Sequence, residues 1–357
     1  MTGASDGPDT SAYQPIRPPY PTVSVVVDVE EEFDWSRPFS SENTGVEAIR
    51  WINLGHTVME AFGIKPAYLL TYPVARSEVA GALFREMVAA GTCEIGAQLH
   101  PWVTPPIEEA ITDVNSYPSN LPMDLERRKN ERLIAAIEAT TGVRPMIYKA
   151  GRYGLDLRRA DMLAGLGFKV DTSIMPFQDF SGVDAGPDFF GVPSAPFWMD
   201  RGESLLCLPS TQEMVGLLAN RMPNRVLRAL YTPRMERLRV PGVLARLGLL
   251  ERLRLSPEGF GFENARRLID ACHARGITCF VMSFHSPSLK PGCTPYVRNE
   301  AELGRLVDTI YLTLRYLTET AGARPTSVLE LYRMLKPEPA PSQPWRGKED
   351  APHDLPP

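Results

Sequence analysis

TVSVVVDVEEEFDW, residues 22–35, decides the fold that this sequence predicts. The stretch opens as an apolar, β-branched run that is typical of a strand buried on both faces. It then turns acidic, with five carboxylates in seven positions: Asp28, Glu30, Glu31, Glu32 and Asp34. If the strand continues, Glu30 and Glu32 share the face of Asp28, whereas Glu31 points away. Buried parallel strands present catalytic or metal-binding groups from their C-terminal ends, although an acidic surface loop is the alternative interpretation.

Three later strand-like runs favour a functional site over a surface loop. They end in His100, Arg152 and His285, so polar groups follow several strands in the same manner. Helical patterns of roughly 10–20 residues separate the strand-like runs, an order that calls for parallel pairing and right-handed crossovers. The chain is therefore predicted to be α/β, either a barrel or an open doubly wound sheet. Functional groups at successive strand ends favour the barrel.

Proline-rich ends set the limits of the predicted folded part. Residues 1–20 and 337–357 contain many prolines and few apolar side chains, which predicts disordered segments. One barrel is expected over residues 21–336, with an insert at about 175–260 that is rich first in Gly, Pro, Asp and Phe and then in Arg and Leu. A long loop that contains Pro and Asn, at about 103–122, follows the third strand-like run, and loops of this length are often functional.

The composition excludes several classes of protein. The chain has 357 residues, of which 43% are hydrophobic, and its net charge of −5 indicates no nucleic-acid partner. No apolar run approaches the ~20 residues that span a bilayer. The polar N-terminus lacks the pattern of a signal peptide, and the five cysteines form no CxxC pair. These features predict a cytoplasmic protein with reduced thiols.

The polar strand ends supply the groups that a hydrolytic site requires. Carboxylates can hold a divalent cation or accept a proton from water. A neutral histidine can bind a metal, and a protonated one can donate a proton to a leaving group. An arginine can orient a carboxylate or stabilise an oxyanion. The acidic cluster together with His100, Arg152 and His285 therefore predicts a hydrolase site in one cleft.

In their order along the chain, these residues resemble the polysaccharide deacetylases of the NodB-homology type, carbohydrate esterase family 4. Within that family the chain is most similar to the bacterial WalW-like branch. The matching motifs are Asp28 with Glu30, EIGAQLHPW at Glu94–Trp102, KAGRYG at Lys149–Gly154, Asp171, and the strand that ends in His285. The resemblance implies an α/β fold, a distorted (β/α)7 barrel of the NodB-homology type.

The resemblance also implies a hydrolase that removes acetyl groups from N- or O-acetylated sugars, or from a related amide, with a metal-activated water. Asp28 would take a proton from that water, His285 would protonate the leaving group, and Arg152 paired with Asp171 would hold Asp28 in place. The implied ligands of the divalent metal, which is zinc or else cobalt or nickel, are Glu30, His100 and Asp28. From side-chain chemistry, the expected substrate-binding residues are Gln98 as a hydrogen-bonding group and the aromatic Trp102 and Tyr153 as surfaces on which a sugar could stack, with core packing as the alternative interpretation.

One motif departs from the family pattern. Gln98 stands where the family usually has the first of two histidines, and Trp102 stands four positions later. A neutral amide is a poor zinc donor, and zinc sites usually take three protein ligands from His, Asp, Glu or Cys. Two alternatives to the metal-dependent deacetylase therefore stay open. One is a catalytically silent barrel that binds a carbohydrate or a protein partner, and the other is a metal-independent amidase that uses the acidic cluster and His285.

Overall fold

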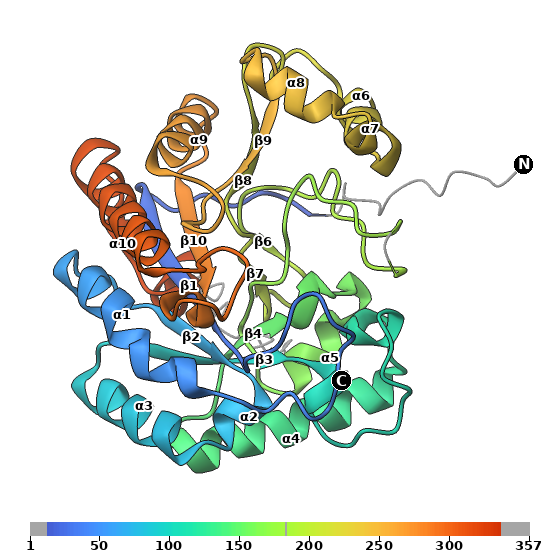
Figure 1. The fold of residues 1–357 in the computed structure, drawn as a ribbon, viewed down its shortest axis with the longest axis vertical. Helices are drawn as coiled ribbons and strands as arrows, with labels where there is room; N and C mark the ends of the chain where they lie inside the picture. The colour runs from blue at the N-terminus through green and yellow to red at the C-terminus, as the bar shows by residue number, and fades with distance from the viewer. Residues whose placement is uncertain (1–12, 183, 337–357) are drawn as a thin grey trace, which may run out of the picture.

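The computed structural model describes residues 13–182 and 184–336, which form a curled sheet surrounded by helices (Figure 1). The predicted α/β barrel is confirmed. The strands are β1 (Thr22–Val29), β2 (Ala67–Leu70), β3 (Glu94–Leu99), β4 (Ile147–Ala150), β5 (Val170–Asp171), β6 (Phe197–Trp198), β7 (Leu206–Cys207), β8 (Gln212–Val215), β9 (Glu251–Arg254), β10 (Cys279–His285) and β11 (Arg324–Pro325). The helices are α1 (Ile52–Ala61), α2 (Tyr72–Ala75), α3 (Glu78–Ala90), α4 (Met123–Thr141), α5 (Ala160–Gly165), α6 (Asn224–Leu230), α7 (Pro233–Arg237), α8 (Val240–Arg246), α9 (Phe262–Ala274), α10 (Glu300–Arg315) and α11 (Val328–Leu335).

The main sheet brings distant parts of the chain together at one edge. Its order is β10-β1-β2-β3-β4-β5-β7-β6, and β11 pairs with β1. The strands from β10 to β7 pair in parallel, whereas β6 runs antiparallel to β7. The register places Asp28 opposite His285 and Gln98 opposite Lys149. Since these strands are parallel, their C-terminal ends deliver all four side chains to the same end of the barrel.

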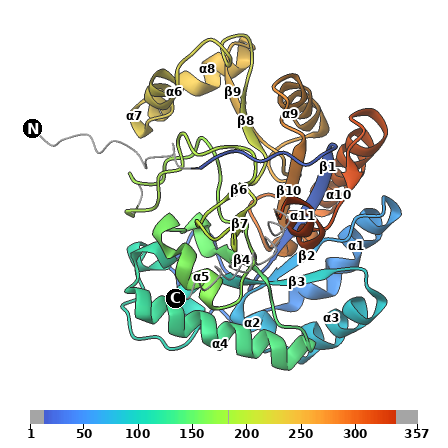
Figure 2. The ribbon, with the colours of Figure 1, turned by 180° about the vertical axis from the view of Figure 1, so that it is seen from behind.

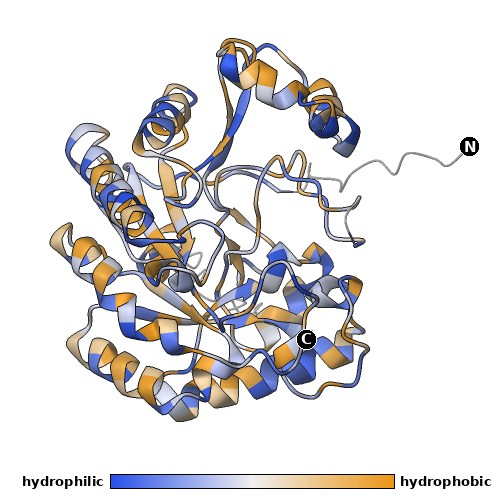
Figure 3. Cartoon of the chain, in the orientation of Figure 1, coloured by the Kyte–Doolittle hydropathy of each residue, from blue (hydrophilic) through white to orange (hydrophobic). Residues whose placement is uncertain are grey.

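Alternation along β1 decides which of its side chains enter the barrel. The core layer shared with the outer helices contains the odd-numbered valines of the strand: Val23, Val25, Val27 and Val29. Val26 instead packs in the barrel interior, in a cluster that includes Val328 of α11. Asp28 and Glu30 have the parity of Val26, so they continue the interior face toward the C-terminal end. The outer helices carry both apolar and polar residues, as amphipathic helices on a sheet do (Figure 3).

α11 covers the end of the barrel that lies opposite the C-terminal strand ends, in the view from behind (Figure 2). Ser327 caps this helix and forms a capping box with Glu330. Glu94, the first residue of β3, accepts hydrogen bonds from Ser327 Oγ at 2.6 Å and from Leu329 N at 3.1 Å. The helix is therefore fixed to the start of a barrel strand as well as to the apolar interior.

The predicted insert at 175–260 forms part of the barrel wall. β6 and β7 join the main sheet, and β8 pairs with β9 in a separate antiparallel hairpin. The segments next to this hairpin bond to β10, since Thr211 N–H donates to Val281 O and Ser283 N–H donates to Leu255 O, each at 3.2 Å. α6, α7 and α8 connect the two hairpin strands at the top of Figure 1. The hairpin therefore lies next to the strand that carries His285.

The two predicted tails are described only in part. Residues 13–20 were expected to belong to a disordered arm, but they lie against the barrel, where Ile16 N–H donates to Pro196 O at 2.7 Å. Residues 1–12 and 337–357, the remainder of the predicted tails, lie outside the described residues. Within the described part of the chain, no helix is both long enough and apolar enough to cross a membrane.

Candidate active site

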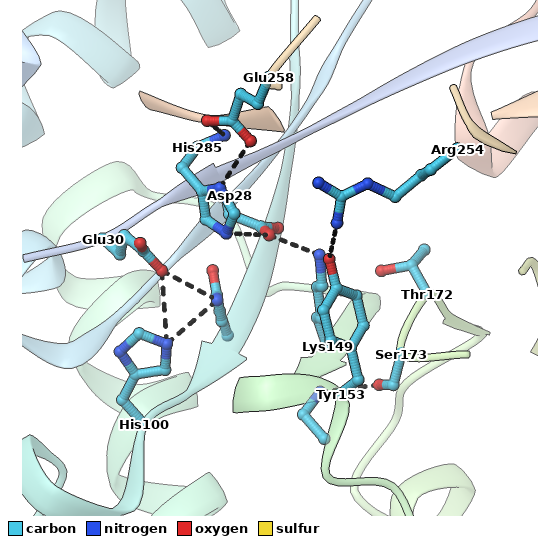
Figure 4. Close-up of polar contacts among 12 residues, drawn as sticks. Asp28, Glu30, His100, Lys149, Tyr153, Thr172, Ser173, Arg254, Glu258 and His285 are labelled. Atoms are coloured by element: carbon cyan, nitrogen blue, oxygen red, sulfur yellow. Dashed lines mark hydrogen bonds and ion pairs between the residues drawn. The ribbon is translucent and has the colours of Figure 1, made fainter. Parts of the chain in front are cut away.

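Polar side chains from four strands converge at the C-terminal end of the barrel (Figure 4). Their sources are β1 for Asp28 and Glu30, β3 for Gln98 and His100, β4 for Lys149, and β10 for His285. Several of these residues follow the last residue of their strand by one position or end the strand themselves. The predicted meeting of the acids of the first strand with two distant histidines is thus present in the structure.

Asp28 forms a buried ion pair with a residue that we did not single out from the sequence. Lys149 Nζ lies 2.5 Å from Asp28 Oδ2, and His285 Nε2 lies 3.6 Å from the same oxygen. Burial lowers the pKa of Lys149, but Asp28, Tyr153 and Glu30 together outweigh burial and raise the pKa above its usual value. Lys149 therefore stays an ammonium ion, and the Asp28 carboxylate lies between two cationic groups.

His285 is held from behind by Glu258, in the loop after β9. Its Nδ1 lies 2.8 Å from Glu258 Oε2, and its backbone N–H donates to Glu258 Oε1 at 3.1 Å. Ser288 Oγ also donates to Glu258 Oε1, so the carboxylate is fully engaged. Burial alone would lower the pKa of His285, but the carboxylates of Glu258, Glu30 and Asp28 raise it to about 10. His285 is therefore an imidazolium ion at neutral pH, with Nε2 directed toward the pocket (Figure 4).

Glu30 lies at the centre of a second polar group. Its Oε2 accepts a hydrogen bond from Gln98 Nε2 at 3.3 Å and lies 3.5 Å from His100 Nε2. Gln98 Nε2 also lies 3.1 Å from His100 Nε2. Burial raises the pKa of Glu30 to about 7, although His285 and His100 act in the opposite direction. Among the described residues none donates to Glu30 Oε1, so this oxygen is available to a bound molecule.

Glu31 supports the site from outside the pocket. It was predicted to point away from Asp28, and its Oε1 accepts hydrogen bonds from His100 Nδ1 at 2.8 Å and from Trp102 Nε1 at 3.1 Å. The His100 and Trp102 rings are stacked, with centroids 4.2 Å apart. Glu31 thus fixes the orientation of the His100 ring. The hydrogen bond at Nδ1 also determines whether Nε2, the ring nitrogen that faces the pocket, acts as a donor or as an acceptor.

Arg152 and Asp171 do not have the arrangement that was predicted for them. Arg152 Nη1 donates to Asp113 O at 3.0 Å and to Ser116 Oγ at 2.5 Å, and Nη2 lies 3.4 Å from Asp184 Oδ2. Its backbone has φ 55°, a left-handed conformation that turns the side chain toward the loop around 113–117. The predicted pair of Arg152 with Asp171 is therefore wrong, and Lys149 is the cation that holds Asp28.

Asp171 is a buried structural acid in this arrangement. Its Oδ1 accepts from Ser173 N at 2.9 Å and its Oδ2 accepts from Ser173 Oγ at 2.7 Å. Burial raises the pKa of Asp171 to about 7. Ser173 Oγ in turn accepts a hydrogen bond from the backbone N–H of Ala150 at 2.7 Å. Asp171 therefore supports the strand end that carries Lys149 and does not itself line the pocket.

A cavity of about 510 Å³ opens above these groups. The predicted site residues that line it are Asp28, Glu30, Gln98, His100, Trp102, Arg152, Tyr153 and His285. Its remaining lining residues are largely aromatic or cationic: Phe33, Trp35, Arg37, Phe39, Tyr117, Lys149, Gln178, Phe180, Arg254 and Tyr296. A pocket of this volume with an aromatic wall and a few convergent polar groups is typical of a small-molecule site.

Three residues of the site were missed by the sequence analysis. Lys149 lies inside the KAGRYG motif, and a lysine within an apolar strand run is a signal, because buried lysines are rare unless paired. Glu258 and Arg254 lie in or beside the hairpin of the insert, which no sequence pattern connected to the other strand ends. Their places in the site follow only from the packing of that hairpin beside β10.

Comparisons with solved structures bear on the fold. A protein from Mycobacterium smegmatis, provisionally described as a polysaccharide deacetylase, has a TM-score of 0.51 at 15% identity, and the match covers 90% of this chain and 93% of that chain. The chain has the polysaccharide deacetylase fold. PuuE allantoinase matches with a TM-score of 0.49 at 18% identity over 89% of this chain and 93% of its own. A protein from Pseudomonas aeruginosa PAO1, also provisionally described as a polysaccharide deacetylase, has a TM-score of 0.48 at 15% identity, with 88% and 90% covered.

Sequence comparisons give no relative of this deacetylase-type barrel. No family model matches the chain, and no curated protein matches it in a sequence search. The assignment to the WalW-like branch therefore stays a prediction. The fold alone does not decide the chemistry, which has to be argued from the side chains of the site.

The side chains at the end of this deacetylase-type barrel do not fit a three-ligand zinc site. Among the described residues, no group of three or more His, Cys, Asp or Glu side chains is arranged to hold a metal ion. Asp28, one of the predicted ligands, is paired with the ammonium of Lys149. The position between Glu30 and His100 is taken by the amide of Gln98, whose NH₂ group lies toward both and offers no lone pair to a cation. The predicted metal site is therefore absent from this part of the chain.

Proposed function

We propose that the protein is a hydrolase that removes an acetyl group from an acetylated sugar or a related amide by acid–base catalysis. The observation that supports it is that Glu30 and His285 line the same aromatic pocket. Near neutral pH a carboxylate of Glu30 and a protonated His285 are present together. Amide hydrolysis needs a base for the attacking water and an acid for the leaving amine. One carboxylate with a pKa of about 7 and one imidazolium with a pKa of about 10 meet both needs near neutral pH.

Glu30 is the proposed general base. The free Oε1 accepts a proton from water as the water oxygen attacks the acyl carbon, and Gln98 keeps the carboxylate in place through Oε2. Its pKa of about 7 suits this step better than that of an ordinary carboxylate, because a stronger base takes the proton more readily. The geometry favours Glu30 over Asp28, which we first predicted as the base, because Asp28 is engaged by Lys149.

His285 is the proposed general acid. When the tetrahedral intermediate collapses and the C–N bond breaks, Nε2 gives its proton to the leaving nitrogen. Glu258 orients the ring through Nδ1 and stabilises the imidazolium form, as the carboxylate does in a Ser-His-Asp catalytic triad. The proton that Glu30 received from water then returns to the solvent or to His285, which restores the enzyme.

Lys149 and Asp28 provide the electrostatic part of the mechanism. One N–H of Lys149 bonds to Asp28, which leaves further N–H donors on the ammonium facing the pocket. A buried cation at this position can stabilise the oxyanion that develops on the acyl oxygen. Asp28 in turn keeps Lys149 and His285 positively charged. Asp28 is thus a positioning residue in this proposal.

The aromatic wall indicates the shape of the substrate. Tyr153 and Phe180 are stacked with centroids 5.9 Å apart, and Trp35 and Tyr296 each lie beside the His285 ring. Flat aromatic faces bind sugar rings or planar amides, because either presents a broad apolar face. This wall supports an acetylated ring compound as the substrate.

The test is hydrolysis of acetylated glucosamine and of a chromogenic acetyl ester, with and without a chelator. We expect turnover that a chelator leaves unchanged and that Glu30→Gln and His285→Asn each lower by at least about 100-fold, a typical contribution of one acid or base. Loss of activity on chelation would reject the acid–base mechanism without metal. If the protein hydrolysed neither the acetylated glucosamine nor the acetyl ester, the proposed deacetylation would be rejected.

A catalytically silent binding barrel is the second candidate, and the pairing of Asp28 with Lys149 favours it. In such a protein the polar groups neutralise one another and serve recognition. It predicts that acetylated sugars bind with no release of acetate. Calorimetric binding together with acetate release on the same ligand would separate the two candidates.

A further inference from the structure

We propose that the pocket binds a substrate that carries a carboxylate, and that Arg254 is the residue that binds this carboxylate. The inference deepens the proposed function and rests on it for the identity of the pocket as a substrate site. It starts from one guanidinium group that bonds to tyrosine hydroxyls but has no carboxylate partner among the described residues.

Arg254 is the last residue of β9, and its side chain reaches into the pocket beside the reactive groups (Figure 4). Its Nη1 donates to Tyr153 Oη at 3.1 Å. The Tyr153 ring in turn lies 4.9 Å from Lys149 Nζ, so Arg254 is one side chain away from the ion pair of Asp28. The guanidinium is therefore close to the position at which a bound molecule would react.

Each of the other lysine and arginine side chains that line the pocket has a carboxylate partner. These pairs are Arg37 with Asp34 at 3.2 Å, Lys149 with Asp28 at 2.5 Å, and Arg152 with Asp184 at 3.4 Å. Arg254 has no carboxylate within 4.0 Å among residues 13–182 and 184–336. Its Nε is buried and has no hydrogen-bond partner within the same ranges. Arg254 thus differs from the other cationic side chains of the pocket, because no carboxylate neutralises its charge.

The acid that interacts electrostatically with Arg254 cannot supply the missing partner. Glu258 attracts Arg254 electrostatically, but its oxygens already bond to the backbone N–H and ring of His285 and to Ser288 Oγ. A buried charge without a partner is costly to the folded protein. A ligand that brings its own anion would offset this cost when it binds. A guanidinium without a carboxylate partner in this position is therefore suited to bind the anion of a ligand.

The chemistry of the group favours a carboxylate. A guanidinium presents parallel N–H donors that match the two oxygens of a planar carboxylate. The pocket already contains Asp28 and Glu30, so a dianion would meet stronger repulsion than a singly charged group. The aromatic wall can hold a ring between the scissile acyl group and the carboxylate. The substrate class that fits is an acylated ring compound with a single carboxylate.

The experiment compares two probes of the same shape, 4-acetamidobenzoate and 4-acetamidobenzamide, by isothermal titration calorimetry on the full chain. We expect the wild-type protein to bind the carboxylate at least tenfold more tightly than the amide, as a charged hydrogen-bonded pair would give. Arg254→Gln should remove this preference and leave the affinity for the neutral amide unchanged. Arg254→Lys, which keeps the charge but not the fork of donors, should retain part of it.

Arg252→Gln is the matched control, because Arg252 lies on the same strand but does not line the pocket and instead bonds to Phe177 O. It should keep the full preference of the wild type. Equal binding of the two probes by the wild type, or failure to bind either, would overturn the proposal, as would a preference that persists in Arg254→Gln. Should Arg254→Gln not fold, the wild-type comparison and Arg254→Lys still decide. Binding without turnover would reject the proposed hydrolysis and leave the carboxylate site supported.

Discussion

At the scale of single residues, the site depends on two groups whose protonation departs from the ordinary. Burial raises the pKa of Glu30 to about 7, and the carboxylates around His285, that of Glu258 above all, outweigh burial and raise its pKa to about 10. The difference between the two values is what would allow a base and an acid to coexist in one pocket at neutral pH.

The pH dependence of kcat/KM tests this assignment. Because Glu30 must be deprotonated and His285 protonated, kcat/KM should rise with pH up to about 7 and fall above about 10. Glu258→Gln removes the charge that contributes most to the raised pKa of His285, so the alkaline limb should move to lower pH while the acidic limb stays. An alkaline limb that does not move in Glu258→Gln would show that another group is the acid.

Glu30 should also limit the stability of the protein. Its pKa is raised from 4.5 to about 7 in the folded state, so its contribution to stability is present in full below pH 4.5 and is lost as the pH rises through 7. Glu30→Gln should therefore raise the free energy of unfolding at pH 8 by up to roughly 3 kcal/mol and change it little at pH 4. Urea denaturation at both pH values measures this.

Glu86→Gln, an exposed substitution on α3, is the control and should show the same stability as the wild type at both pH values. A stabilising effect of Glu30→Gln of equal size at pH 4 would mean that ionisation of Glu30 is not its cause. The expected combination of higher stability and lost activity is typical of a functional group that the fold accommodates at a cost.

At the scale of elements, the turn after β4 supports both halves of the site. Gly151 allows the chain to pass close to the His100 ring, because a Cβ built there would lie 2.6 Å from His100 Cδ2 and 2.6 Å from Leu99 O. The next two residues, Arg152 and Tyr153, have φ of 55° and 59°. Two consecutive non-glycine residues in the left-handed region are strained, and such strain is characteristic of functional sites.

Gly151→Ala should displace the His100 ring and with it the contacts of Gln98 and Glu30. We expect a loss of kcat/KM of tenfold or more together with a lower free energy of unfolding, by about 1–3 kcal/mol, as overpacking usually produces. Gly304→Ala in α10 is the control, since a Cβ there meets no atom within 4 Å. The control should stabilise the protein by about 0.5–1 kcal/mol. Wild-type kinetics in Gly151→Ala would argue against a role of His100 in the site.

At the scale of the whole molecule, the two ends of the barrel have separate tasks. The C-terminal strand ends carry the pocket, and the opposite end is closed by α11 over the interior apolar cluster. In barrels of parallel strands, the active site generally lies at the C-terminal ends of the strands, and the opposite end contributes to stability. Changes at the α11 end should therefore alter stability and leave the chemistry intact.

Glu94→Ala tests this separation. The substitution removes the acceptor of Ser327 Oγ and Leu329 N, so α11 should be held less firmly and the free energy of unfolding should fall by about 1–3 kcal/mol. Well below the unfolding temperature, kcat and KM should equal those of the wild type. Denaturation and steady-state kinetics on the same preparation measure both. Altered kinetics at a temperature at which the variant is fully folded would contradict the division.

The sequence alone determined the strands and the direction of the side chains along them. The alternation of residues 22–29 places Asp28 and Glu30 on the interior face, and the strand-like runs that end near His100 and His285 bring both histidines to the same end of the barrel. These features depend on local periodicity and on parallel pairing, which a single sequence carries.

Only the tertiary structure decided which charges meet. Lys149 pairs with Asp28 across 121 positions of sequence, and Glu258 reaches His285 through a hairpin whose place in the wall has no local signal. Arg152 was expected to hold Asp28 because it lies in the motif that resembles the family's arginine-containing turn, but the left-handed backbone directs its side chain elsewhere. Partner choice among buried charges depends on distances of a few ångströms, and those are fixed by packing rather than by spacing along the chain.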